Sequence, residues 1–246
     1  MKSINKISVC IATYNGEKYI VEQIESILTQ LPDDGEIIIS DDCSTDDTLN
    51  LINSFNDKRI SIYKNESRNL IKNFENAIKH ARGEIIFLAD QDDIWALDKV
   101  KKMLEIFDKG FDIVVSDCEI INAEYKVVVP SYFKAIDSGS GFIRNLVKRN
   151  SYMGCCMAFR TTVKEMALPF PEKIPMHDLW IGMLGEINYK PYFLDEKLVM
   201  YRQHENNASD TSLGISKYSL WQKIEFRIII LYYLLGRFFK YKFYNN

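Results

Sequence analysis

Short apolar runs alternate with longer amphipathic segments through the first half of the chain. The runs predict buried strands at residues 7–12, 36–40, 59–63 and 84–89. The intervening segments repeat apolar residues at intervals of three and four, which predicts helices at residues 17–30, 46–55, 69–81 and 96–107. This alternation is typical of an α/β protein with a Rossmann-like, mostly parallel sheet flanked by helices.

The second half of the chain has a less regular pattern. Apolar runs predict strands near residues 113–116, 157–160 and 198–201, and helical spacing predicts helices near residues 141–148 and 177–186. No repeat, low-complexity tract or flexible linker divides the chain. We therefore expect a single domain with halves at residues 1–112 and 113–210, followed by a helical tail at 211–246.

The composition indicates an ordered globular protein without a nucleic-acid partner. The 246 residues are 47% hydrophobic and 26% charged, and the net charge of −3 provides no basic field for nucleic acid. The five cysteines form no CxxC pair, so neither a disulfide framework nor a zinc site is indicated. The longest apolar stretch, 228–236, is about half the roughly 20 residues of a spanning helix. We expect a cytoplasmic protein, and the polar residues after 7–12 are not typical of a signal peptide.

Polar residues follow three of the predicted strands directly. Because ligands bind at the carboxyl ends of parallel strands, these residues should converge on one edge of the sheet. They are Thr13 and Tyr14 after the first strand, Asp41 and Asp42 after the second, and Asp90, Asp92 and Asp93 after the fourth.

The segment FLADQDDIW places three mutually repelling carboxylates within four residues. Magnesium prefers oxygen ligands and often uses one or two carboxylates together with substrate phosphates. The D-x-D pair of Asp90 and Asp92 would supply part of such a shell beside a diphosphate. The alternative is a solvated turn that caps the next helix. Asp41 has a similar alternative, because acidic residues are also favourable at a helix N-terminus.

Together these motifs resemble the family 2 glycosyltransferases, which have the GT-A fold. The resemblance extends from Ile7 to about Ser209, and it is carried by ISVCIATYNGEKYI, IIISDDCSTDDT, GEIIFLADQDDIW, GCCMAFR, HDLW and YRQHENNAS. The combination of DQDDIW, HD and YRQH resembles bacterial rhamnosyl-, galactosyl- and glucosyltransferases that build O-antigen or capsule repeat units. Two departures are the missing Gly before KNFE and Glu205, where the family often has Gly.

The resemblance implies that residues 1–112 bind a UDP- or dTDP-sugar donor. It assigns the donor nucleotide to Thr13, Tyr14, Glu17, Asp41, Asp90 and Arg202. It assigns a divalent metal, Mg²⁺ or Mn²⁺, to Asp92 and His204. It assigns the donor sugar and the acceptor to Asp93, Trp95, Gly154 and His177.

The resemblance also makes Asp178, in residues 113–210, the catalytic base. One base without a carboxylate nucleophile implies a single displacement that inverts the anomeric centre. Burial beside Trp180 would raise the pKa of Asp178 toward neutrality. The alternatives are an ordinary acidic residue in the first turn of a helix for Asp178 and a surface turn for His204.

The tail differs in composition from the rest of the chain. Residues 217–246 contain six Lys or Arg, one Glu and many aromatic residues. A basic, aromatic amphipathic helix suits an anionic membrane surface. We therefore expect a peripheral protein on the inner face of the bacterial plasma membrane, with a polyprenyl-diphosphate-linked saccharide as acceptor. The alternative is a helix packed on the domain or on a second copy in a homodimer.

Two other functional classes fit the sequence less well. A nucleotidyltransferase would need a Gly-rich first loop for a triphosphate, whereas TYNGEKY has a single Gly. A catalytically inactive scaffold or sensor for sugar nucleotides would not need both Asp92 and Asp178, which are intact.

Overall fold

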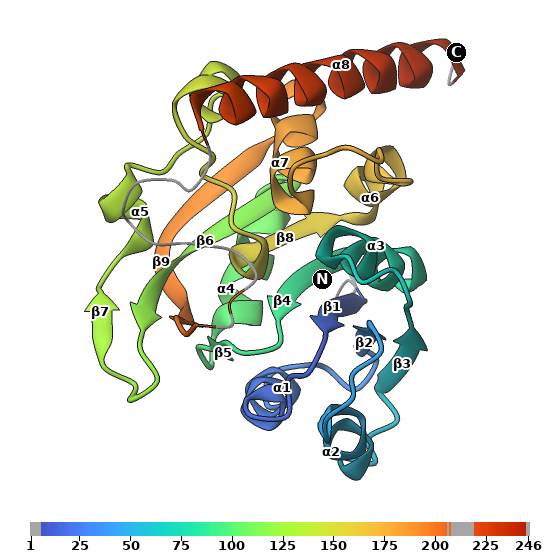
Figure 1. Ribbon diagram of the computed structural model, residues 1–246, viewed down its shortest axis with the longest axis vertical. Coiled ribbons are helices and arrows are strands. Elements are labelled where there is room, and N and C mark those ends of the chain that lie inside the picture. The colour runs from blue at the N-terminus through green and yellow to red at the C-terminus, as the bar shows by residue number, and fades with distance from the viewer. Residues whose placement is uncertain (1–5, 206, 208–218, 245–246) are drawn as a thin grey trace.

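One mixed sheet with helices on its faces organises the protein (Figure 1). The computed structural model describes residues 6–205, 207 and 219–244. The strand order in this part of the chain is β3-β2-β1-β4-β8-β6-β9-β5, with β7 paired to β6. The four strands predicted in the first half are present and parallel: β1 (Ile7–Thr13), β2 (Glu36–Asp41), β3 (Ile60–Lys64) and β4 (Ile85–Asp90).

The four helices predicted in the first half are also present. They are α1 (Ile20–Leu28), α2 (Thr48–Ser54), α3 (Leu70–His80) and α4 (Lys99–Asp108). Helix α1 begins three residues later than expected, because the backbone N–H groups of Tyr19 and Ile20 bond to the Gly16 carbonyl in a turn. Helix α3 begins where the Asn69 side chain accepts the backbone N–H of Lys72, which caps its N-terminus.

The second half is not a continuation of the parallel pattern. Its strands are β5 (Ile94–Trp95), β6 (Ile113–Ile121), β7 (Val127–Val129), β8 (Met157–Arg160) and β9 (Pro191–Arg202). Strand β8 runs antiparallel to β4 and β6, whereas β9 is parallel to β6. Strand β6 continues beyond the predicted apolar run because buried Asp117 accepts hydrogen bonds from Ser131 and Phe133.

The helices of the second half are mostly short. They are α5 (Tyr132–Ile136), α6 (Thr161–Ala167) and α7 (His177–Asn188), with a 3-10 turn at Gly154–Cys156. The helix expected near residues 141–148 is present at residues 142–148, where Arg144–Lys148 has π-helical hydrogen bonding. Cys155 and Cys156 are free and buried, so they pack as small apolar residues.

Helix α8 (Leu220–Tyr244) lies across α7 at the edge of the molecule (Figure 1). Ile230 and Leu234 are buried at this contact, and Arg237 donates hydrogen bonds to three carbonyls of residues 166–169. One face of the expected tail is therefore packed on the domain. The start of the expected tail, residues 211–218 with Lys217 among them, lies outside the described part of the chain. Within the described part, none of the helices combines the length and apolarity that crossing a membrane requires.

Candidate active site

The polar clusters at the strand ends meet around one cavity, as the parallel order predicts. The cavity has a volume of about 420 Å³. Its lining comes from the ends of β1, β2 and β4 and the residues that follow them, from the start of α3, and from the end of β9 and the segment after it. The lining residues are Ala12, Thr13, Tyr14, Asp42, Arg68, Asn69, Leu70, Asn73, Asp90, Gln91, Asp92, Tyr201 and Asn207.

Asp42, and not its neighbour Asp41, reaches the cavity at the end of β2. Asp41 is 2% exposed, and its carboxylate accepts hydrogen bonds from the Thr13 hydroxyl at 2.8 Å and from Ser44. Asp42 accepts the backbone N–H groups of Arg68 and Asn69 at the start of α3. Adjacent side chains at a strand end point to opposite sides, so the sequence alone could not choose between these two acids.

The two loops that follow β1 and β4 are joined by Gln91. Its side-chain carbonyl accepts the Tyr14 backbone N–H at 2.9 Å, and its amide donates to the Tyr14 carbonyl at 3.1 Å. A Cβ on Gly16 would lie 2.4 Å from the same amide oxygen, so a larger residue here would displace the Gln91 amide. Tyr14 is 55% exposed at the cavity. Glu17 lies outside the cavity lining and accepts the backbone N–H of Asp47.

Two acidic side chains, Asp90 and Asp92, line the cavity together. Burial, together with the charges of Asp92 and Asp178, raises the pKa of Asp90 to about 8. The Asp92 carboxylate lies 2.9 Å from Nε2 of His204, so the structure brings together the two residues expected at a metal. These oxygen donors fit a hard divalent cation such as Mg²⁺ or Mn²⁺.

A second acidic group lies beneath the cavity. Ligand atoms of Asp90, Asp93 and Cys155 lie within 4.8 Å of one another. Cys155 is buried, and its sulfur is a soft ligand, whereas Mg²⁺ and Mn²⁺ prefer oxygen ligands. Asp93 is 1% exposed and lies outside the cavity lining. The Asp90 and Asp92 side of the acidic cluster therefore fits the cation best.

Three residues expected at the donor or acceptor lie behind the cavity. Asp93 accepts the backbone N–H of Arg202 at 3.0 Å. Trp95 is 2% exposed, and the Lys99 ammonium group lies 4.0 Å from its ring centre. Arg202 is 1% exposed and contacts the backbone of Asp92 instead of lining the cavity. All three side chains are buried, and none of them is among the residues that line the cavity.

Asp178 lies in the first turn of α7, beside the 3-10 turn that contains Gly154. Burial raises the pKa of Asp178 to about 7, and its charge acts on Asp90. A Cβ on Gly154 would lie 2.9 Å from Nε2 of His177, so glycine allows α7 to approach this turn. His177 stacks on Phe74 at 4.1 Å between ring centres, and burial lowers its pKa to about 3, so its imidazole is neutral.

The sequence analysis did not identify Asn69 and Asn73 as site residues. Both line the cavity, and the Asn73 amide donates a hydrogen bond to the Thr13 carbonyl at 3.1 Å, which holds α3 against β1. Their only sequence signal is their position at the start of the third predicted helix. That signal gives no distance to the end of the first strand.

An α/β sheet that carries paired acids at a cavity on its carboxyl edge is the arrangement expected of a sugar-nucleotide-dependent glycosyltransferase. The model of the family described as Glycosyl transferase family 2 matches residues 8–167. The chain belongs to this family.

Curated relatives and a solved structure agree with this assignment. The dTDP-rhamnosyl transferase RfbG of Shigella flexneri is 32% identical over 82% of this chain and 74% of its own. The UDP-Glc:alpha-D-GlcNAc-diphosphoundecaprenol beta-1,3-glucosyltransferase WfgD of Escherichia coli is 27% identical over 94% of this chain and 91% of its own. The crystal structure of S. aureus TarS 1–349 in complex with UDP matches with a TM-score of 0.65 and 26% identity. That match covers 80% of this chain, which spans only 60% of the TarS chain.

Proposed function

We propose that the protein is an inverting, metal-dependent glycosyltransferase that moves a sugar from a UDP- or dTDP-sugar to a lipid-linked saccharide in cell-surface polysaccharide biosynthesis. The observation that carries this proposal is the pair of acids, Asp90 and Asp92, that lines one cavity, with Asp178 near enough for its charge to raise the pKa of Asp90. The names of the relatives support the donor and acceptor classes: RfbG is named for dTDP-rhamnose transfer, and WfgD for UDP-glucose and a diphosphoundecaprenol-linked acceptor.

The cavity residues divide into a nucleoside end and a diphosphate end. Tyr14 offers an exposed ring for stacking a base, and Asp42 offers carboxylate oxygens to a base N–H or to a ribose hydroxyl. The diphosphate belongs beside Asp90 and Asp92, where a bound Mg²⁺ or Mn²⁺ would act as a Lewis acid for the leaving group. Asp178 would accept the proton of the attacking acceptor hydroxyl.

A panel of nucleotide sugars tests this function directly. Nucleotide release with Mg²⁺ or Mn²⁺ should identify the donor, since slow hydrolysis of the donor does not need an acceptor. A catalytically inactive scaffold would bind a nucleotide sugar without releasing nucleotide. NMR of the transferred sugar should show inversion, and retention would refute the single displacement.

The pH dependence of transfer should report the ionisation of Asp178. The base must be deprotonated to act, and burial raises its pKa to about 7. We therefore expect kcat/KM for the acceptor to rise about tenfold per pH unit below that pKa and to level off above it. Measurement between about pH 5.5 and 9 at saturating metal checks this expectation. A flat profile across pH 7 would be inconsistent with Asp178 as the base.

We further propose that the outer face of α8 docks on an anionic membrane. Trp221, Ile228, Tyr232, Leu235 and Phe239 are all more than half exposed and follow helical spacing along one face. Ile230 and Leu234 pack against the domain on the opposite face. Arg227 donates hydrogen bonds to the Leu146 and Val147 carbonyls, which places the exposed residues Ile143, Val147, Lys148 and Arg149 alongside the helix.

This surface combines apolar and cationic groups, as the lipid interface requires. The aromatic side chains would enter the headgroup region, while Lys148 and Arg149 would meet anionic lipid. A peripheral position would bring the cavity to a lipid-linked acceptor.

The triple variant Trp221→Ser, Tyr232→Ser, Phe239→Ser should lose vesicle binding while it keeps the packed face of α8. Its partition coefficient onto anionic vesicles should fall at least about tenfold, since each buried aromatic contributes roughly 1.5–3 kcal/mol when it is fully removed from water. Co-sedimentation at low and high salt measures the loss, and wild-type binding should weaken with salt. Leu97→Ser, at an 81% exposed position outside α8, is the control.

Two outcomes would contradict the membrane proposal. If the wild-type protein does not bind anionic vesicles, the membrane proposal is wrong. A concentration-dependent dimer that the triple variant abolishes, measured by sedimentation velocity without lipid, would assign the surface to a second copy of the chain.

A further inference from the structure

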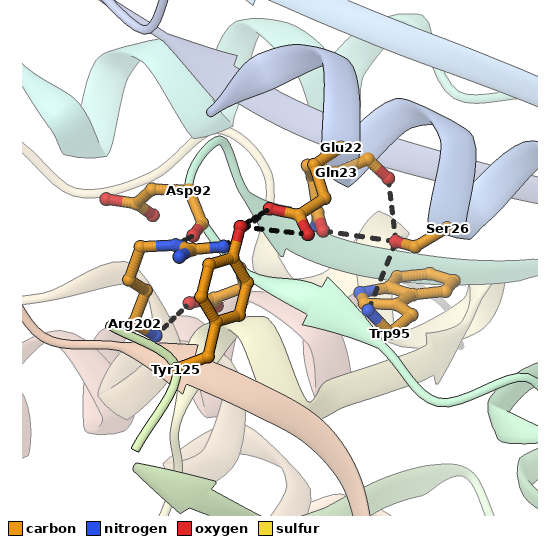
Figure 2. Close-up of polar contacts among 8 residues, drawn as sticks. Glu22, Gln23, Ser26, Asp92, Trp95, Tyr125 and Arg202 are labelled. Carbon is orange, nitrogen blue, oxygen red and sulfur yellow. Dashed lines mark hydrogen bonds and ion pairs between the residues drawn. The ribbon is translucent and has the colours of Figure 1, made fainter. Parts of the chain in front are cut away.

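Arg202, at the end of β9, is a fully buried arginine whose hydrogen bonds join the loop after β4 to helix α1 (Figure 2). Its Nε donates a hydrogen bond to the Asp92 carbonyl at 3.0 Å. Its Nη2 contacts the Glu22 carboxylate at 2.7 Å. Its backbone N–H donates to Asp93 at 3.0 Å. One residue therefore holds both the backbone of Asp92 and the side chain of the next residue.

Two tyrosine rings enclose the guanidinium group. The guanidinium carbon lies 4.6 Å from the ring centre of Tyr19 and 4.6 Å from that of Tyr125. The Tyr125 hydroxyl also donates to Glu22, with distances of 3.0 and 3.2 Å to its two oxygens (Figure 2). A buried charge is costly unless it is paired, and here a carboxylate, a carbonyl and two aromatic faces compensate it.

The same contacts extend to His204. Tyr19 stacks on the His204 ring, with centres 5.0 Å apart and planes inclined by 21°. His204 in turn lies 2.9 Å from the Asp92 carboxylate. Asp92 is thus held at its carbonyl by Arg202 and at its carboxylate by His204, and Tyr19 packs between the two basic side chains.

We infer that Arg202 is a positioning residue that fixes Asp92 for the divalent cation and makes no contact with the donor. This inference rests on the proposed metal-dependent transfer. Arg202, Glu22, Tyr19 and Tyr125, here called the Arg202 clamp, join α1, the turn between β6 and β7, and β9 to the Asp92 loop. A planar guanidinium can bond the carbonyl and the carboxylate while it stacks on both rings. A lysine ammonium group cannot reproduce that geometry.

Arg202→Lys tests the clamp through metal affinity. The dissociation constant for Mn²⁺, measured by calorimetry with UDP present, should rise about 10- to 100-fold, the usual effect of losing a group that orients a metal ligand. Transfer at low Mn²⁺ should fall and recover at high Mn²⁺. The donor KM at saturating metal and UDP binding without metal should stay near wild type. Tyr125→Phe, which removes only the hydroxyl, should shift Mn²⁺ affinity less and in the same direction.

Arg160→Lys is the matched control. Like Arg202, Arg160 donates to backbone carbonyls, those of Phe107 and Phe111, and contacts a carboxylate, Glu84, and a ring, Phe107. Arg160 lies where β8 meets β4 and β6, and it is not among the residues that line the cavity. The Arg160→Lys substitution should lower Tm and leave the Mn²⁺ dissociation constant unchanged. Should Arg202→Lys fail to fold, Glu22→Gln carries the same test, because Glu22 is partly exposed.

Three results would overturn the inference. An unchanged Mn²⁺ dissociation constant in Arg202→Lys, with a loss of Tm like that of Arg160→Lys, would make the clamp purely structural. Weaker UDP binding without metal would instead place Arg202 at the donor. Wild-type transfer that is indifferent to metal would remove the metal from the proposed function itself, and the inference with it.

Discussion

Asp178→Asn is expected to reduce sugar transfer by about 10²-fold or more, the usual scale for the loss of a general base. Asn preserves the shape of the side chain at the start of α7 and removes the proton acceptor. Because Asp178 lies outside the cavity lining, nucleotide binding should remain close to that of wild type. Steady-state transfer and calorimetric titration with UDP measure the two effects separately.

Stability provides a second readout for Asp178→Asn. Burial raises the pKa of Asp178 from 3.8 to about 7, so the native state binds this proton more tightly than the unfolded chain does. The ionised group therefore destabilises the native state once the pH exceeds about 4, and the full penalty is present above pH 7. At pH 8 the Asn variant should melt no lower than wild type. Below about pH 4 any advantage should disappear, because Asp178 is then protonated in both states.

Asp98→Asn is a suitable comparison. Asp98 precedes α4 and contacts Lys102 at 2.7 Å, so it is also an acid at the start of a helix, but it lies outside the cavity lining. This variant should transfer sugar at the normal rate. If Asp178→Asn does the same, Asp178 is an ordinary acidic residue at a helix N-terminus and another group accepts the proton.

The sequence predicted the first half of the fold well because its signals are local. Strand-length apolar runs and helical spacing determine β1 to β4 and α1 to α4 with small shifts of their ends. The second half depends on contacts that carry no local signal. Strand β6 continues through buried Asp117, whose carboxylate is satisfied by Ser131 and Phe133, and the antiparallel direction of β8 follows from pairing with strands distant in sequence.

The candidate site shows the same division. Motif spacing placed Asp90, Asp92 and Tyr14 at the carboxyl edge of the sheet, and the cavity lies there. Which of Asp41 and Asp42 faces the cavity depends on the side to which each side chain points at the end of β2, and the sequence does not show this. The position of Arg202 depends on Glu22, which is 180 residues away in the sequence. A motif identifies residues near a site, but only the packed structure separates those that face the cavity from those that support it.

Asp92→Asn should have the largest effect on metal-dependent transfer. The Asp92 carboxylate lines the cavity and faces His204, and the backbone beneath it is fixed by Arg202. An amide keeps the size of the side chain but removes the negative charge that a hard cation requires. Stabilisation of a leaving group by a metal is worth several kcal/mol, and about 1.4 kcal/mol corresponds to tenfold in rate, so transfer should fall about 10³-fold.

Binding measurements separate this loss from misfolding. Asp92→Asn should lose the enhancement of UDP binding by Mn²⁺ and should bind UDP equally with and without EDTA. Its Tm without metal should stay near wild type, because the substitution also relieves repulsion between Asp92 and Asp90, whose pKa is raised partly by the Asp92 charge. Normal transfer by Asp92→Asn in the presence of EDTA would contradict the assignment. Retained Mn²⁺ affinity would move the cation to the buried group of Asp90 and Asp93, because ligand atoms of those residues also lie within 4.8 Å of each other.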